Sequence, residues 1–132
     1  MEIETIDKRL DILNASKLLK GSSLVLDLFD NNAARTCVQQ VVRKLDIPCI
    51  HGGVIGGYAE VVHDIYYRVP RDQNVGDVCD YPLARNIIML AVAVLSEEVV
   101  DFMSSKKPRY KNWSITLKDL KISELKLSQD GT

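Results

Sequence analysis

The hydrophobic pattern of the chain alternates between short apolar runs and stretches with helical spacing. Ser23–Phe29 is a nearly continuous apolar run of strand length, and such runs are typical of strands that are buried on both faces. Asn32–Leu45 follows it with apolar residues at i, i+3, i+4 and i+7, which predicts an amphipathic helix. After Pro48, the segment Cys49–His51 is expected to continue the sheet. This order of elements indicates an α/β fold.

Further elements are predicted on both sides of this unit. Glu2–Arg9 alternates as a strand does, and Asn14–Gly21 has an asparagine and a glycine where a short helix begins and ends. The remaining expected elements are strands at Tyr58–Ile65, Trp113–Leu117 and Lys121–Leu127, and a helix from Pro82 to about Met103. We therefore expect one α/β domain over residues 1–127, with antiparallel strands toward the C-terminus and a frayed tail at 128–132.

Ile87–Leu95 is the longest apolar run, and it is apolar on nearly every face. Its nine residues are far fewer than the roughly 20 that span a bilayer. A helix of this kind is normally buried all round, so core packing is the main interpretation and a dimer interface is the second.

Composition excludes several classes of function. The chain has 132 residues, of which 46% are apolar, as expected for one globular domain. A formal charge of −1 and the lack of a long basic run give no electrostatic case for nucleic-acid binding. Three cysteines without paired spacing argue against a disulfide framework and favour a reducing compartment. We expect a cytoplasmic protein that binds neither nucleic acid nor membrane.

The strand end at Asp30 and Asn31 is the strongest candidate for chemistry. In open α/β sheets, ligands bind outside the carboxyl ends of the strands, and a carboxylate there can hold a metal–phosphate complex. The competing interpretation is a helix cap, in which Asn31 or Asn32 accepts a hydrogen bond from a free backbone donor. Arg35, near the first turn of the helix, either contacts a phosphate or pairs with a surface carboxylate.

Cys79, in the polar segment Tyr66–Tyr81, is not predicted to bind zinc. No second cysteine lies at metal spacing, and four protein ligands cannot be assembled locally. Asp77 and Asp80 would raise the pKa of its thiol, which works against a reactive thiolate. We expect an inert or structural residue and no zinc site.

The other cysteines and the two histidines are interpreted as structural. Cys37 and Cys49 fall on a predicted helix and strand and are expected to be packing residues. His51 and His63 are expected to be hydrogen-bonded residues within strands. No serine or cysteine stands at a position that suggests a Ser-His-Asp or Cys-His site.

Several motifs occur in a fixed order along the chain. They are Asp30-Asn31 after an apolar strand, Arg35 in the next helix, Ile47-Pro48, Gly52-Gly53, the strand start Gly56–Val61 and the apolar helix Ile87–Leu95. This set resembles the carboxyl-terminal half of the ThiF/MoeB family, the prokaryotic relatives of ubiquitin-activating enzymes, from about Ile3 to about Leu120. The resemblance implies a partial Rossmann-like sheet with flanking helices. It also implies that Asp30 handles Mg²⁺ and the phosphates of ATP, with Asn31 and Arg35 as further nucleotide-binding candidates.

The nucleotide-binding half of that family has no counterpart in this pattern. Family members carry a glycine-rich turn there, an acidic residue for the ribose, and arginine and lysine residues for the triphosphate. In this chain no G-x-G-x-x-G motif follows a strand, and Gly52, Gly53, Gly56 and Gly57 precede another strand-like run instead of a helix. The chain therefore resembles half of an adenylating domain that is truncated, completed by another polypeptide, or no longer catalytic.

If an N-terminal half completes the domain, the resemblance implies ATP-dependent adenylation of the C-terminal carboxylate of a ubiquitin-like or sulfur-carrier protein. The alternative is a non-catalytic binding or assembly module derived from the same fold. The resemblance makes Glu2–Arg9 the third strand of the domain and Ser23–Phe29 the fourth. In the doubly wound order the first two strands, which are absent here, would lie between them. Either Glu2–Arg9 pairs directly with the apolar strand, or a second copy covers that strand, and we expect a homodimer.

ATP and Mg²⁺ are expected as cofactors of a completed enzyme, and none is expected for this chain alone. Backbone donors at a glycine-rich helix start supply much of nucleotide binding in Rossmann-like domains, and the sequence has no such turn. Titration calorimetry of the chain with Mg–ATP should therefore show no binding in the micromolar range. A micromolar dissociation constant would contradict this prediction.

Overall fold

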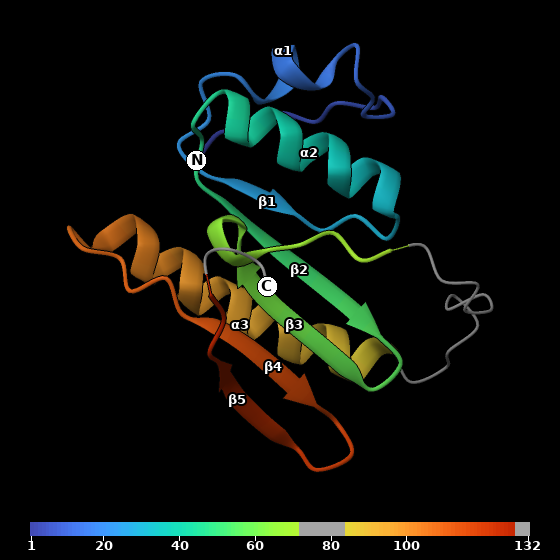
Figure 1. Cartoon of the computed structure of the whole chain (residues 1–132), viewed down its shortest axis with the longest axis vertical. Helices are drawn as coiled ribbons and strands as arrows, with labels where there is room; N and C mark the ends of the chain where they lie inside the picture. Colours follow the sequence, from blue (N-terminus) through green and yellow to red (C-terminus); the bar gives the residue numbers. More distant parts are fainter. Residues whose placement is uncertain (72–83, 129–132) are drawn as a thin grey trace.

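The computed structural model describes residues 1–71 and 84–128, and the structural statements that follow concern these residues. They form one five-stranded sheet with flanking helices (Figure 1). The strands are β1 (Val25–Asp27), β2 (Cys49–Ile55), β3 (Tyr58–His63), β4 (Asn112–Thr116) and β5 (Lys121–Leu125). The helices are α1 (Ala15–Leu19), α2 (Asn32–Lys44), α3 (Ala84–Ser104) and the short 3₁₀ helix η1 (Asp64–Tyr66).

The sheet is parallel only at its first pair of strands. Its order is β1-β2-β3-β4-β5, with β1 parallel to β2 across α2 and every later pair antiparallel. Between β2 and β3 the chain turns at Gly56-Gly57, and Gly56 has a φ of 58°, as tight hairpins require at that position. The predicted α/β class with antiparallel strands toward the C-terminus is confirmed.

The two long helices cover opposite faces of the sheet. Val38 and Val42 of α2 pack against Cys49 on one face of β2. Ile50, the next residue of β2, points to the other face and packs against Leu95 of α3. In Figure 1, α1 lies against the outer side of α2, and α3 crosses behind β3 and β4. The core therefore consists of two layers separated by the sheet.

The N-terminal segment Glu2–Arg9 is not a strand. Residues 1–10 contain no helix or strand, and residues 1–9 are exposed. The sheet ends at β1, and the segment does not pair with the open edge of this strand, so its alternating pattern did not make it a strand. The strand prediction was wrong, and so was the possibility that this segment pairs directly with β1.

Within Ser23–Phe29 only β1 is a strand, and it is buried on one face. Leu26 and Leu28 are 42% and 59% exposed because β1 lies at the edge of the sheet and one side of it is open. The expectation of a strand buried on both faces was therefore wrong for the described structure.

The predicted helices are present with small shifts at their ends. Asn14–Gly21 corresponds to α1, and Gly21 ends it with a φ of 83°. Asn14 does not cap this helix through its side chain, because its Oδ1 accepts a hydrogen bond from the N–H of Asp11 instead. Asn32–Leu45 corresponds to α2. Most of the predicted polar segment Tyr66–Tyr81 lies outside the described residues.

α3 is buried along one face only, so the expectation of a helix buried all round was wrong. Ile87 and Leu95 are 0% and 6% exposed, whereas Ile88 and Met89 are 45% and 71% exposed. The apolar outer face of α3 stays open in the single chain. Pro82, its predicted first turn, lies outside the described residues. Over residues 1–71 and 84–128, no helix combines the length and the apolarity that crossing a membrane requires.

The neighbours Ile87 and Ile88 provide a test of this orientation. Ile87→Ala should lower the free energy of unfolding by about 2–5 kcal/mol, because it leaves a cavity beneath the sheet. Ile88→Ala should change it by less than about 1 kcal/mol, because this side chain is half exposed. Chemical denaturation of both variants measures the difference, and equal losses would mean that α3 is oriented otherwise.

Candidate functional site

The turn between β1 and α2 carries Asp30 at the carboxyl end of the parallel strands. Asp30 is exposed, and Nδ2 of Asn31 lies 3.4 Å from its Oδ1 as a hydrogen-bond donor. The carboxylate is therefore open to solvent at the edge of the sheet where ligands bind in this type of fold.

Asn31 is the N-cap of α2. Its backbone is extended, with φ −134° and ψ 147°, and its Oδ1 accepts a hydrogen bond of 2.8 Å from the N–H of Ala34. The cap interpretation is thus correct for Asn31, and Asp30 is left without a capping role. A contact of Asn31 with a nucleotide stays a prediction.

A chain of alternating charges runs from the interior beside this turn to the surface, where its last residue, Arg43, is half exposed. Nδ1 of His51 lies 2.5 Å from Oδ2 of Asp27, and Nε2 lies 2.7 Å from Oδ1 of Asp64. Arg35 pairs with Asp27 at 3.2 Å, and Arg43 pairs with Asp64 at 2.9 Å. We call these five residues the charge network. The side chains of Asp27 and His51 are fully buried.

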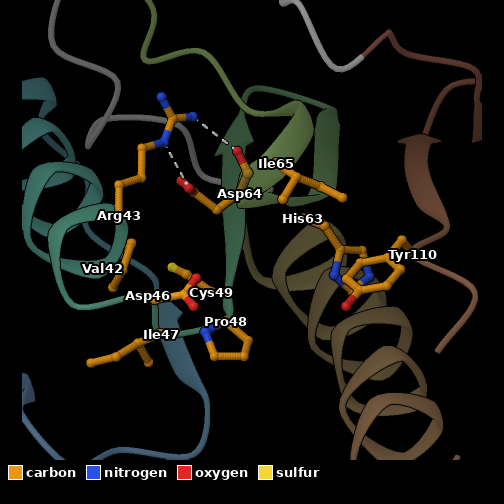
Figure 2. Close-up of a pocket in the computed structure, with 10 residues that line it drawn as sticks. All are labelled: Val42, Arg43, Asp46, Ile47, Pro48, Cys49, His63, Asp64, Ile65 and Tyr110. Atoms are coloured by element: carbon orange, nitrogen blue, oxygen red, sulfur yellow. Dashed lines mark hydrogen bonds and ion pairs between the residues drawn. The ribbon is translucent and has the colours of Figure 1, made fainter. Parts of the chain in front are cut away.

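Helix α2 supplies its part of the network from one face. Arg35, Gln39 and Arg43 are spaced four residues apart, so their side chains lie one above the other. Gln39 donates to Oδ1 of Asp64 at 3.1 Å, in the gap between the two arginines. Figure 2 shows the far end of the network, where Arg43 reaches Asp64 beside a cavity of about 280 Å³.

Hydrogen bonds keep the network charged in spite of its burial. Burial lowers the pKa of His51, but the hydrogen bonds to Asp27 and Asp64 outweigh this effect and raise the pKa to about 10. Burial raises the pKa of Asp27 and Asp64, but the hydrogen bonds from His51 and from neighbouring donors bring both below their usual value. At neutral pH an imidazolium therefore lies between two carboxylates.

Arg35 faces the interior of the protein. Its guanidinium donates to Oδ2 of Asp27, the hydroxyl of Tyr67 and the carbonyl of Gly52, and the residue is 8% exposed. The expectation of a surface carboxylate as its partner was wrong, because the partner is the buried Asp27. Contact of Arg35 with a phosphate stays a prediction.

The structural interpretation of the histidines is confirmed. His51 belongs to the charge network, and Nε2 of His63 lies 3.0 Å from Oε2 of Glu98. Cys49 is buried in the core beside α2, and burial raises the pKa of its thiol. Cys79 lies outside the described residues. Within residues 1–71 and 84–128, no group of three His, Cys, Asp or Glu residues is arranged to hold a metal ion.

A second cavity, of about 570 Å³, adjoins the Asp30 turn. Phe29 and Asn31, on either side of Asp30, line it together with Lys8 and Arg9 of the N-terminal segment. The sequence interpretation missed these two cations because it placed them in a strand. The adjacent basic pair is visible in the sequence, but only the tertiary structure puts it beside this turn.

The comparison with known families decides the affiliation of the chain. A model of the ThiF family matches residues 1–130. The chain belongs to the ThiF family. The resemblance inferred from Asp30-Asn31 and the glycine motifs is confirmed, and the family indicates an adenylyltransferase-type fold.

Solved structures show the same fold. This ThiF-family chain matches the crystal structure of selenomethionine PaaA with a TM-score of 0.55 and 14% identity, over 89% of this chain and 46% of that one. It matches the crystal structure of E. coli MccB with MccA-N7isoASN with a TM-score of 0.62 and 14% identity, over 94% of this chain and 44% of that one. The crystal structure of E. coli MccB with succinimide matches with a TM-score of 0.57 and 17% identity, over 90% of this chain and 41% of that one. The chain thus spans less than half the length of each neighbour. A comparison with curated proteins finds no match.

The charge network predicts how stability depends on pH. The pKa of His51 is raised on folding, so its stabilisation is fully present below about pH 6.5 and is lost as the pH rises through about 10. The pKa values of Asp27 and Asp64 are lowered on folding, so their stabilisation is lost as the pH falls below about 3.8. The free energy of unfolding should therefore decrease toward both extremes.

His51→Gln separates this contribution from the rest of the protein. It should cost about 3–5 kcal/mol at pH 7, because two buried carboxylates lose the cation between them. It should also remove the decrease in stability between pH 7 and 10, whereas His63→Gln should keep it. Denaturant melts across this pH range provide the measurement. If the free energy of unfolding of the wild type decreases between pH 7 and 10 by no more than that of His51→Gln, the pH dependence does not come from His51.

Proposed function

We propose that this ThiF-family chain provides the metal-facing part of an ATP-dependent adenylating site. The substrate is the C-terminal carboxylate of a ubiquitin-like or sulfur-carrier protein, and a nucleotide-binding half completes the site. The observation that carries the proposal is the exposed Asp30 carboxylate at the carboxyl end of β1, on a turn whose neighbouring residues are hydrogen-bonded.

The donors near Asp30 fit Mg²⁺ only together with phosphate oxygens. Mg²⁺ in nucleotide sites is usually bound by one or two carboxylates plus substrate phosphates. Asp30 offers one exposed carboxylate, which accepts a hydrogen bond only from Nδ2 of Asn31 among the bonds described above, and Oδ1 of Asn31 is already used by the helix cap. When bound, Mg²⁺ would neutralise phosphate charge during transfer of the adenylyl group. The role of Asp30 in this proposal is to hold the metal at the sheet edge.

Lys8 and Arg9 support the proposal through their charge. A bare carboxylate repels a triphosphate, so a phosphate site beside Asp30 needs cations in addition to the metal. Both residues line the cavity beside Asn31, and they outnumber the one carboxylate in its lining, Asp11. In this proposal they attract the phosphates toward the turn and offset the charge of Asp30.

The second candidate is a non-catalytic binding or assembly module. It is favoured by the absence of a glycine-rich turn from the sequence and by two open apolar surfaces in the described residues. These surfaces are the β1 edge with Leu26 and Leu28, and the outer face of α3 with Ile88 and Met89. In this case the chain acts through a homodimer or another protein partner that covers them.

ATP–pyrophosphate exchange with and without an added N-terminal half of a ThiF-type domain tests the proposal. Exchange should need both parts. Asp30→Asn should reduce the rate by about 100-fold or more, because the metal loses its charged ligand. The same variant should change the free energy of unfolding by less than about 0.5 kcal/mol, because Asp30 is exposed and is not the cap.

Asp46→Asn is the matched control for this assay. Asp46 is exposed at the opposite end of α2 and has a φ of 54°, a conformation that asparagine tolerates well. This control should keep full exchange activity. Equal activity of Asp30→Asn and the wild type would remove Asp30 from the mechanism. Absence of exchange in every combination would favour the non-catalytic module.

A further inference from the structure

Asp27 and Arg35 flank Asp30 in the sequence, and their ion pair closes the loop that carries it. Nη1 of Arg35 lies 3.2 Å from Oδ2 of Asp27, and the two side chains are 9% and 0% exposed. The ends of the loop are thus joined in the interior, while Asp30 lies exposed between them. A closed loop of this length leaves its central residue few conformations.

Two further hydrogen bonds fix the loop on each side of Asp30. The N–H of Phe29 donates to Oδ1 of Asp27 at 3.0 Å, and the N–H of Ala34 donates to Oδ1 of Asn31 at 2.8 Å. Oδ1 of Asp27 therefore holds the turn before Asp30, while its Oδ2 binds Arg35 and His51.

Arg35 also attaches the closed loop to the rest of the protein. Nη2 donates to the carbonyl of Gly52 in β2 at 2.6 Å, and Nη1 lies 3.2 Å from the hydroxyl of Tyr67, beyond η1. The three acceptors come from three different segments of the chain. A planar guanidinium can reach all of them at once, whereas a lysine ammonium is a single point charge on a flexible stem.

These contacts decide between two roles for Arg35. To bind a phosphate at the surface, its guanidinium would have to give up bonds to a buried carboxylate, a carbonyl and a hydroxyl. Hydrogen bonds to charged groups are stronger than those between neutral groups, and Asp27 would keep a buried charge with one partner fewer. The internal arrangement is therefore favoured over contact with a ligand.

We propose that Arg35 is a positioning residue, which holds Asp30 where the proposed site requires its carboxylate. The mechanistic part of this inference rests on the proposed function, whereas the closure of the loop does not. Without the Arg35–Asp27 pair, metal binding would have to order the loop first, and that ordering weakens binding. Loss of the pair should therefore raise the Mg²⁺ requirement of the reaction more than it lowers the rate at saturating Mg²⁺.

Arg35→Lys tests the proposal, with Arg43→Lys as the matched control. Both change an arginine of the same helix face and the same charge network, but Arg43 lies outside the Asp30 loop and binds Asp64. The first measurement is amide hydrogen exchange of Phe29 and Ala34 in the isolated chain. Exchange at both should be about tenfold faster in Arg35→Lys and nearly unchanged in Arg43→Lys.

The second measurement is the Mg²⁺ dependence of pyrophosphate exchange in the completed pair. Arg35→Lys should need about tenfold more Mg²⁺ for half of its maximal rate, and excess Mg²⁺ should restore that rate. Arg43→Lys should keep the wild-type requirement. A merely destabilised protein would not be rescued by the metal.

Tyr67→Phe keeps the test valid if Arg35→Lys does not fold. It removes one acceptor of Arg35 and keeps the ring that stacks on His51 with centroids 3.8 Å apart. A smaller acceleration of amide exchange at Phe29 and Ala34 supports the proposal, and no acceleration in either variant overturns it.

Unchanged Mg²⁺ dependence in Arg35→Lys also overturns the proposal, while the proposed function stands. Absence of exchange by the wild-type pair refutes the proposed function, and the amide measurements then decide the loop closure alone.

Discussion

The parallel part of this structure depends on the protonated His51 between two buried carboxylates. Asp27 ends β1, His51 lies opposite it in β2, and Asp64 begins the 3₁₀ helix after β3. Burying these charges is expensive, and a buried ion pair often adds little net stability. The charge network instead selects one packing arrangement, because any arrangement that separates the three side chains leaves an uncompensated charge in the interior. The network thus fixes the register of β1 and the position of α2.

The same network connects the interior to the exposed turn where chemistry is proposed. α2 begins at the carboxyl end of β1 with the Asn31 cap and places Arg35 one turn later. That spacing lets one helix cap its own N-terminus and bind Asp27 at the strand end. In the proposed site, a short surface turn gains rigidity in this way from groups that lie in the interior of the protein.

The described chain leaves two apolar surfaces uncovered, and they lie on different elements. β1 contributes an open strand edge with exposed leucines, and α3 contributes an outer face with exposed Ile88, Met89 and Val92. Single exposed apolar residues are ordinary, but contiguous ones usually mark an interface. Both candidate functions require that another polypeptide covers at least one of these surfaces. The need for a covering polypeptide follows from the position of the short strand β1 at the edge of the sheet.

The sequence by itself determined the fold class, the helix α2, the positions of strands β2 and β3 and the family, and it narrowed the cap of α2 to Asn31 or Asn32. These features depend on local spacing and residue type, which the sequence displays directly. It did not determine that Glu2–Arg9 remains outside the sheet, because a strand needs a partner and alternation does not reveal one. It also did not reveal that Arg35, His51 and Asp64 meet, or that Lys8 and Arg9 line a cavity beside Asn31. Such contacts join residues far apart in the chain, and only the packing of α2 on the sheet decides which charges share the interior.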